Sequence, residues 1–320
     1  MTLKRTASAR LPRLVWSGPA LAAVLAILTA SPALAAGPHH GGGGGGSTTS
    51  TTGNDVSYPQ CGGSFPSSPA FGIVGVNDGL ANNLNPCLGP SSSYPSYTQS
   101  ELYWAVADST GTTAQPKASL YVNTADPGNV YNNLPVADWP TSGSTPYGSC
   151  TTTTVTTSDG TYTVGADSPA CAWQYGYDKA EQDASWVTAA ADSIDAQSPP
   201  HPVATSAGSY PWWLDVETAN SWQTGTPGQD MNVADLQGMI VALSTAGATT
   251  VGAYSTSSQW DQITGGTTSA SGSLYGIPDW IPGARKLSEA VSNCQLTSFT
   301  GGRVALTQWF SRPYDSDYAC

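Results

Sequence analysis

Short apolar runs bounded by glycine, proline and polar residues recur along the chain and predict buried strands. Four such runs occupy residues 71–76, 118–122, 212–217 and 250–254. Apolar residues at consecutive positions over five or six residues are typical of strands covered on both faces, as in a parallel sheet.

Two segments between these runs carry apolar residues at helical spacing. In residues 179–194 the stripe consists of Ala180, Ala184, Val187, Ala191 and Ile194, with Asp178 as the expected N-cap. In residues 233–246 it consists of Val233, Leu236, Ile240 and Leu243, and Gly247 suits the C′ position. Alternating strands and helices predict a mainly parallel sheet with crossover helices, and a closed α/β barrel is its expected form.

The N-terminal residues predict export. Four basic residues precede an apolar stretch at 20–28, and the small residues Ala33-Leu34-Ala35-Ala36 follow, so we interpret residues 1–36 as a signal peptide. Residues 37–53 are rich in Gly, Ser and Thr and are expected to form a flexible linker. Residues 54–320 are then expected to form one barrel domain of ordinary size. We expect the protein to be secreted and monomeric.

Charge and histidine content exclude several functions. The formal net charge is -12, and it becomes -16 once a signal with four basic and no acidic residues is removed. This acidity argues against a nucleic-acid partner. No segment outside the signal is long and apolar enough to predict a membrane span. Of the three histidines only His201 lies in the expected domain, in a proline-rich surface loop, which disfavours serine or cysteine nucleophile systems. No nucleotide-binding motif is present, and we expect no cofactor.

An even number of cysteines in an exported chain favours disulfides over a metal site. No Cys-x-x-Cys motif occurs, so no metal centre is expected. Six cysteines allow 15 connectivities, of which we favour sequential pairing, each bridge being worth about 3 kcal/mol in the chain-entropy model. The expected pairs are Cys61 with Cys87, Cys150 with Cys171, and Cys294 with Cys320. The Ser/Thr-rich tract 141–163 is then a stapled loop excursion, not a domain boundary.

The third strand candidate ends in two acids spaced i, i+2. Strand side chains alternate between faces, so Asp215 and Glu217 project the same way, with Cβ atoms roughly 6.5–7 Å apart. Glycoside hydrolysis uses two carboxyl groups about 5–5.5 Å apart for retention or about 6.5–9.5 Å for inversion. The pair suits either outcome, although acids are also common at solvated strand ends.

The order of the strand-end motifs resembles glycoside hydrolase family 25, the Chalaropsis-type lysozymes, and related secreted glycoside-hydrolase-like proteins of actinobacteria. The similarity covers residues 54–320 and rests on the order and spacing of short motifs. These motifs are Asp55-Val56-Ser57, Val76-Asn77-Asp78-Gly79, Leu120-Tyr121-Val122-Asn123, Leu214-Asp215-Val216-Glu217, Gly252-Ala253-Tyr254-Ser255-Thr256, Asp279-Trp280-Ile281, Leu306-Thr307-Gln308-Trp309 and Asp315-Ser316-Asp317.

The resemblance implies an irregular TIM-type barrel, with about five βα units followed by three strands joined mostly by loops, and an active site at the carboxyl ends of the strands. It implies that Glu217 is the general acid, that Asp215 is the ionised partner and that Asp55 tunes the pair. Crowding of the carboxyls would keep one of them protonated. Expected substrate contacts are Asp78, Tyr121, Trp213, Tyr254, Gln308, Trp309 and Asp317.

The chain also departs from the family pattern. The family usually has Tyr-His where this chain has Tyr121-Val122, a Glu where it has Asp78, and Trp-Gln-Tyr where it has Thr307-Gln308-Trp309. The acid pair is retained, but muramic acid is not specified as the sugar.

Structural alternatives exist for several of these residues. Asp55 and Asp78 could be helix caps or strand-end acceptors, and Asp315 and Asp317 could form a solvated turn. Most of the aromatic residues are expected to pack in the core, although Trp213 shares a face with Asp215 and could floor the site.

Three functions fit these observations. The leading hypothesis is a secreted glycosidase acting on a cell-wall or environmental polysaccharide, including peptidoglycan-type glycans. The alternatives are a catalytically inactive glycan-binding barrel at the cell exterior and a surface-exposed structural module on a glycine tether.

Overall fold

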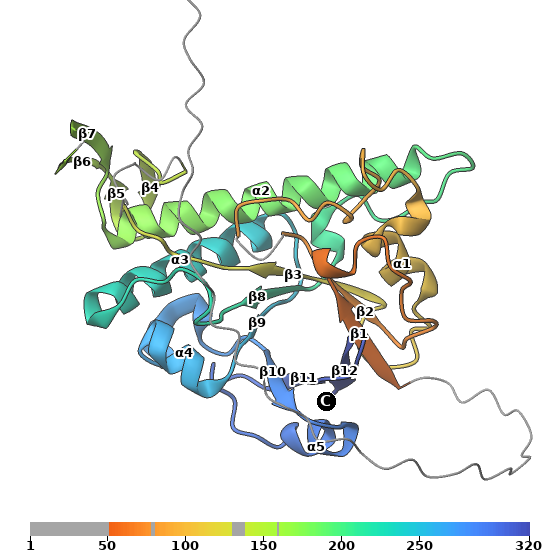
Figure 1. Cartoon of the computed structure of the whole chain (residues 1–320). Helices are drawn as coiled ribbons and strands as arrows, with labels where there is room; N and C mark the ends of the chain where they lie inside the picture. Colours follow the sequence, from red (N-terminus) through yellow and green to blue (C-terminus); the bar gives the residue numbers. More distant parts are fainter. Residues whose placement is uncertain (1–50, 78–80, 130–137, 159) are drawn as a thin grey trace, which may run out of the picture. The chain divides into compact units, whose positions relative to one another are not determined.

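The computed structural model describes residues 51–77, 81–129, 138–158 and 160–320, and within them eight strands close into a barrel (Figure 1). Neighbours around the barrel follow the order β1-β12-β11-β10-β9-β8-β3-β2. The strands are β1 (Thr52–Val56), β2 (Gly72–Gly75), β3 (Ala118–Asn123), β8 (Trp212–Asp215), β9 (Val251–Tyr254), β10 (Asp279–Ala284), β11 (Val304–Trp309) and β12 (Asp315–Ala319). The predicted irregular α/β barrel is confirmed, and β1 begins two residues before the expected start of the domain.

Every barrel strand pairs in parallel with its neighbours except β12, which runs antiparallel to both β1 and β11. Five α-helices occur in the described residues, one in each connection from β2 to β11: α1 (Glu101–Asp108), α2 (Pro169–Asp195), α3 (Gly225–Thr245), α4 (Ser257–Thr264) and α5 (Leu287–Asn293). The β1–β2 connection has only the short 3-10 helix η1 (Tyr58–Gln60), and β11 joins β12 by a loop. The helices thus continue as far as β11, one connection later than the expected pattern.

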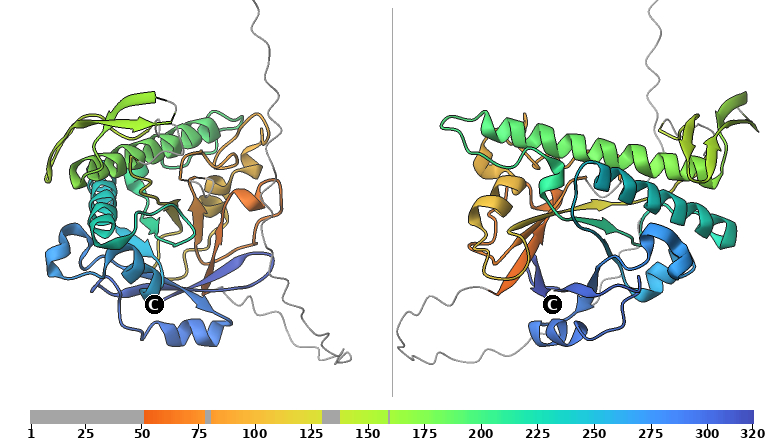
Figure 2. Two further views of the ribbon diagram at one scale, coloured as in Figure 1. Left: turned by 60° about the vertical axis from the view of Figure 1, so that its left-hand side comes forward. Right: turned by 180° about the vertical axis from the view of Figure 1, so that it is seen from behind.

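Helices α2 and α3 lie side by side along one side of the barrel, and α5 lies on the opposite side (Figure 2). The predicted N-cap at Asp178 is wrong, because α2 begins at Pro169 and the Ser168 hydroxyl accepts a hydrogen bond from the Cys171 backbone N–H. Gly176 lies in this early part of α2 and is a poor helix former in isolation. A Cβ atom on Gly176 would lie 2.0 Å from the backbone oxygen of Asp235, so the glycine is required for the close approach of α3. Helix α3 begins at Gly225, and Gly247 follows it with φ +99, as expected for a helix stop.

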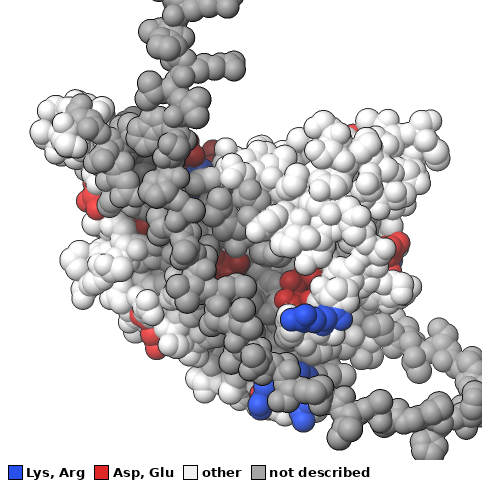
Figure 3. Space-filling model, viewed as in Figure 1, with Lys and Arg blue, Asp and Glu red and all other residues white. Residues whose placement is uncertain are grey.

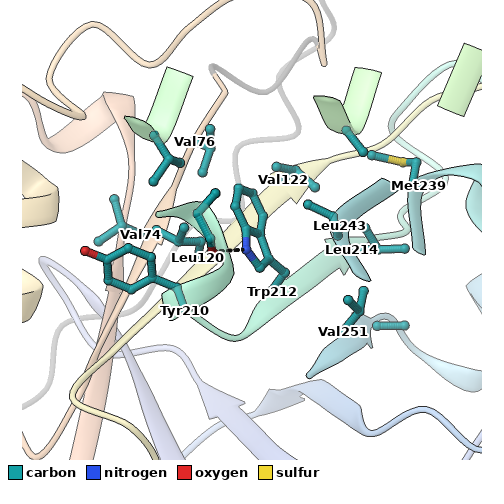
Figure 4. Packing of buried hydrophobic residues seen from close by; sticks show 14 of the residues in the cluster. Val74, Val76, Leu120, Val122, Tyr210, Trp212, Leu214, Met239, Leu243 and Val251 are labelled. Carbon is teal, nitrogen blue, oxygen red and sulfur yellow. Dashed lines mark hydrogen bonds between the residues drawn. The ribbon is translucent and has the colours of Figure 1, made fainter. Parts of the chain in front are cut away.

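The main core fills the space between the barrel strands and the helices (Figure 4). Residues that face outward from β2, β3 and β8, including Val74, Leu120 and Trp212, are fully buried there. The indole N–H of Trp212 donates to the backbone oxygen of Ala207 at 2.9 Å, so burial of this ring leaves no unpaired donor. Each fully buried aliphatic side chain contributes roughly 1.5–3 kcal/mol, which makes this layer the main source of stability.

A second, smaller core lies inside the barrel, and its largest side chains are aromatic. It includes Phe71, Ile73, Trp213 and Trp280. The Trp213 and Trp280 rings meet edge to face, with centroids 6.0 Å apart. A Cβ atom on Gly252 would lie 2.4 Å from the Trp213 ring, so this glycine in β9 makes room for the indole. The barrel is therefore packed below its mouth, as in barrel enzymes generally.

All three predicted disulfides are confirmed: Cys61–Cys87, Cys150–Cys171 and Cys294–Cys320. The Ser/Thr-rich tract forms two hairpins between β3 and α2, as the stapled excursion predicted. Their strands are β4 (Gly143–Thr145), β5 (Gly148–Cys150), β6 (Thr152–Thr157) and β7 (Gly160–Gly165). In the part of the chain that the structure describes, no helix has the length and apolar character needed to cross a membrane.

A buried glutamic acid lies beside the first disulfide. Glu101 is fully buried at the start of α1, where its carboxyl accepts a hydrogen bond from the Asn85 amide at 2.7 Å and lies 3.1 Å from Cys87 Sγ. Burial raises the pKa of Glu101 to about 8, against 4.5 in an unfolded chain. Between these two values the folded state binds a proton that the unfolded state has released, so this group lowers the free energy of unfolding as the pH rises.

We therefore expect the free energy of unfolding to decrease between pH 5 and pH 8. In Glu101→Gln this decrease should be smaller, by at most about 4 kcal/mol. Glutamine retains the acceptor for Asn85 and cannot ionise. Urea unfolding at both pH values measures the effect, with Glu181→Gln on the exposed face of α2 as the control. An unchanged pH dependence in Glu101→Gln would show that Glu101 is not the responsible group.

Candidate active site

Seven of the eight barrel strands direct a polar or aromatic side chain to one cavity, which lies at the carboxyl ends of the parallel strands and the amino end of β12. The cavity has a volume of about 170 Å³ and is lined by Asp55, Tyr121, Asp215, Glu217, Tyr254, Trp280, Gln308 and Asp315. The remaining strand, β2, contributes Gly75. A Cβ atom there would lie 2.9 Å from Tyr121 Cζ, so the glycine leaves room for the tyrosine ring.

The volume of the cavity limits what can enter it. It is close to the ~150 Å³ engineered cavity that admits benzene and below the ~300–1,000 Å³ of sites for drug-sized ligands. One six-membered ring fits, and the rest of a longer ligand must lie outside the cavity.

The two acids of the predicted pair lie at different depths in this cavity. Asp215 is the last residue of β8 and is 7% exposed, whereas Glu217 lies two residues further and is half-buried. The Gln259 amide donates to the Glu217 carboxylate at 3.3 Å, and the Trp222 indole donates to the Glu217 backbone oxygen at 2.9 Å. Helix α4 and the loop after β8 therefore fix the Glu217 side chain and backbone together.

Asp55 and Asp317 form a second acid pair on neighbouring strands β1 and β12. Burial and the neighbouring Asp55 carboxyl raise the pKa of Asp317, so the pair favours a state in which one carboxyl keeps a proton that it can donate to the other. The Trp280 indole N–H donates to Asp317 Oδ1 at 3.0 Å, and the Gln308 amide donates to Asp55 Oδ2 at 3.0 Å. Gln308 in turn accepts a hydrogen bond from the Tyr254 hydroxyl at 2.9 Å, so the aromatic wall is tied to the acids.

Burial and mutual repulsion raise the pKa values of these carboxyls. Burial raises the pKa of Asp55 to about 6, with a further contribution from Asp315. Burial, Glu217 and Asp55 together raise the pKa of Asp215 well above its ordinary value, and burial and Asp55 do the same for Asp317. None of the described residues that line the cavity is basic, so no cation offsets this repulsion. The cluster therefore retains protons at a pH where isolated carboxyls would be ionised.

The structure brings together most of the residues that the sequence indicated. Six of them line the cavity: Asp55, Tyr121, Asp215, Glu217, Tyr254 and Gln308. Asp317 contacts it through Asp55 and is fully buried on β12, so the solvated-turn alternative for this residue is wrong.

Three predicted contacts do not line the cavity. Trp213 faces the barrel interior but lies deeper, where it packs on Trp280 and lines a separate cavity of about 410 Å³ at the opposite end of the barrel. Trp309 follows Gln308 on β11, so its side chain projects to the other face of the strand. Asp78 lies outside the described residues.

Sequence reasoning did not assign three residues of the site. Trp280 and Asp315 line the cavity, and Gln259 holds Glu217. A signal for Asp315 was present, because it is two residues from Asp317 on one strand and shares its face. Gln259 comes from α4 and has no local pattern that connects it with Glu217.

On the face drawn in Figure 3, acidic side chains appear near the centre and the Lys and Arg side chains gather mainly over the lower part. No family model matches the sequence, and no curated protein matches it. Among solved structures, the muramidase from Trichobolus zukalii aligns with a TM-score of 0.39 at 12% identity, covering 85% of this chain and 94% of that one. At a TM-score below 0.5, functional assignment depends on the geometry of the site.

Gln308→Leu tests the hydrogen-bond network. The Gln308 amide stabilises the ionised form of Asp55 and lowers its pKa, so we expect the substitution to raise the Asp55 pKa above about 6. Carboxyl carbon NMR titration measures this value. Gln115→Leu, at the opposite end of the barrel, is the control, and an Asp55 pKa that stays the same or falls in Gln308→Leu would refute the network.

Proposed function

We propose that this chain is a secreted glycosidase that hydrolyses O-glycosidic bonds of a cell-wall or environmental polysaccharide. The observation that carries the proposal is the pair Asp215 and Glu217, which faces a cavity of single-ring size walled by Tyr121, Tyr254 and Trp280. Aromatic faces with polar tips suit the mixed apolar and hydroxyl surface of a sugar ring. The three disulfides and the signal-like N-terminus support export.

The chemistry requires one protonated and one ionised carboxyl. Because burial and the charge of Glu217 raise the pKa of Asp215, the pair holds one proton over a pH range in which two isolated carboxyls would hold none. The raised pKa favours the protonated form of Asp215 in the resting site, so this proton must pass to Glu217 before Asp215 can act as the ionised partner. The environment of the cavity therefore prepares the state that glycosidic cleavage needs.

We assign proton delivery to Glu217. Its half-buried side chain lies at the edge of the cavity, where the glycosidic oxygen between a seated ring and the next sugar would be placed. Asp215 lies deeper and faces the ring, where a carboxylate stabilises the positive charge that develops as the bond breaks. Asp55 raises the Asp215 pKa and so tunes the pair.

Glu217→Gln and Asp215→Asn should each reduce hydrolysis roughly 10²–10⁴-fold, the usual contribution of a positioned acid or base. Both changes replace a carboxyl with an amide of the same shape, so folding should be retained. Residues 37–320 are incubated with peptidoglycan and with wall and plant polysaccharides, and new reducing ends are identified by mass spectrometry. Wild-type activity should fall as the pH rises past the raised pKa of Asp215, because the site then no longer holds this proton.

Glu181→Gln on the exposed face of α2 is the matched control and should retain wild-type activity. Full activity in Glu217→Gln would remove Glu217 from the mechanism. Saturable binding of a glycan by the wild type without any new reducing ends would instead identify a catalytically inactive glycan-binding barrel.

A further inference from the structure

The basic residues of the described chain are distributed unevenly between the two ends of the barrel. Lys117 and Arg303 precede β3 and β11 at the amino ends of these strands, and Lys179 is buried in α2 and paired with Asp138 at 2.7 Å. The other three, Arg285, Lys286 and Arg312, follow β10 and β11. They therefore lie at the carboxyl ends of the strands, the same end as the acid cavity.

The loop of residues 310–314 carries one of these cations, Arg312, and connects two strands that line the cavity. It joins Gln308 on β11 to Asp315 on β12, both of which line the cavity. The backbone N–H of Ser311 donates to the Asp315 carboxyl, and that of Phe310 donates to the Ala284 oxygen at 3.3 Å. The loop is thus anchored both to the cavity wall and to the end of β10, where Arg285 and Lys286 follow.

Phe310 and Arg312 form an exposed aromatic and cationic pair on this loop. Phe310 is 65% exposed, the highest value among the large apolar side chains that the structure describes as exposed. The Arg312 guanidinium lies 5.6 Å from the centre of the Phe310 ring. Within the described residues no carboxylate forms an ion pair with Arg312, although Asp315 is only three residues away. The pair therefore presents a ring face and an uncompensated positive charge to solvent.

We propose that Phe310 and Arg312 form an outer glycan subsite that recognises a carboxylate or phosphate group on the sugar next to the ring seated in the cavity. This inference rests on the proposed function and names its substrate class as an anionic glycan. The cavity itself cannot accept an anion, because its own carboxyls would repel it and no basic residue lines it among those described. The rim offers both a stacking surface for a sugar and a planar guanidinium, which binds carboxylate and phosphate oxygens in pairs.

Arg285 and Lys286 extend the positive rim on the neighbouring strand end. Arg285 is partly neutralised by Glu289, with Nε to Oε2 at 3.3 Å, whereas Arg312 is not paired in this way. Removal of Arg312 should therefore weaken the binding of an anionic glycan most. The other two cations strengthen the positive potential around it.

The test compares affinities for glycans that differ only in charge, using residues 37–320 with Glu217→Gln so that the ligand is not consumed. One pair of ligands is polygalacturonic acid and its methyl ester, which differ in carboxylates. The other is a phosphodiester-bearing wall glycan before and after removal of phosphate. We expect tighter binding of the charged member of one pair, and a fall of roughly ten-fold in that preference upon Arg312→Gln. Phe310→Ala should weaken binding to both members, and added salt should reduce the preference.

Lys117→Gln is the matched control, because it removes the same charge at the opposite end of the barrel and should leave the preference unchanged. The ligand pair that responds distinguishes carboxylate from phosphate recognition. Equal affinity for charged and neutral members, or a preference that survives Arg312→Gln, would overturn the subsite while wild-type hydrolysis upheld the proposed function. Failure to bind or hydrolyse any glycan would reject both.

Discussion

The antiparallel insertion of β12 between β1 and β11 is the constraint on which the site depends. It closes the barrel, and it places Asp315 opposite Asp55 and Asp317 opposite Gln308. The Cys294–Cys320 disulfide and the hydrogen bond from the Cys320 N–H to the Ala305 oxygen hold the end of this strand in place. A strand of five residues thus brings two acids from the end of the chain against one from its first strand.

Crowding of acids without cations then determines the chemistry. Carboxyls on β1, β8 and β12 share a confined volume, and burial raises the pKa of each. Protonation reduces the repulsion between these carboxyls, and hydrogen bonds from Gln308 and Trp280 stabilise them. Packing inside the barrel offsets the remaining unfavourable free energy. Among the described residues at this end of the barrel, the Lys and Arg side chains come from the segments after β10 and β11, outside the cavity. The separation of a cavity lined by crowded carboxyls from a cationic rim is what distinguishes the two parts of the site.

Much of the fold could be predicted from the sequence, because buried parallel strands consist of runs of apolar residues. The runs around Ile73, Leu120, Trp212 and Val251 all became barrel strands. The start of α2 could not be predicted in this way, because glycine is a poor helix former. The reason for Gly176 is the close approach of α3, which only the structure shows. Acid positions at strand ends were also visible, because the i, i+2 rule places Asp215 with Glu217 on one face.

Depth and long-range partners could not be predicted from the sequence. Trp213 and Asp215 share a face, but only the packed barrel shows that Trp280 lies between Trp213 and the mouth cavity. Gln259 approaches Glu217 from a helix 42 residues further along the chain, and no local pattern records that contact. The raised pKa of Asp215 likewise depends on burial, which the local sequence does not record.

The most direct test of the account is the structure of the Glu217→Gln variant bound to an oligosaccharide of a glycan that the wild type cleaves. We expect one sugar ring in the cavity between Asp55, Asp215 and Tyr254, with the glycosidic oxygen within hydrogen-bond distance of the substituted residue 217. An oligosaccharide bound elsewhere, with the cavity free of sugar, would contradict the assignment of this carboxyl cluster as the active site.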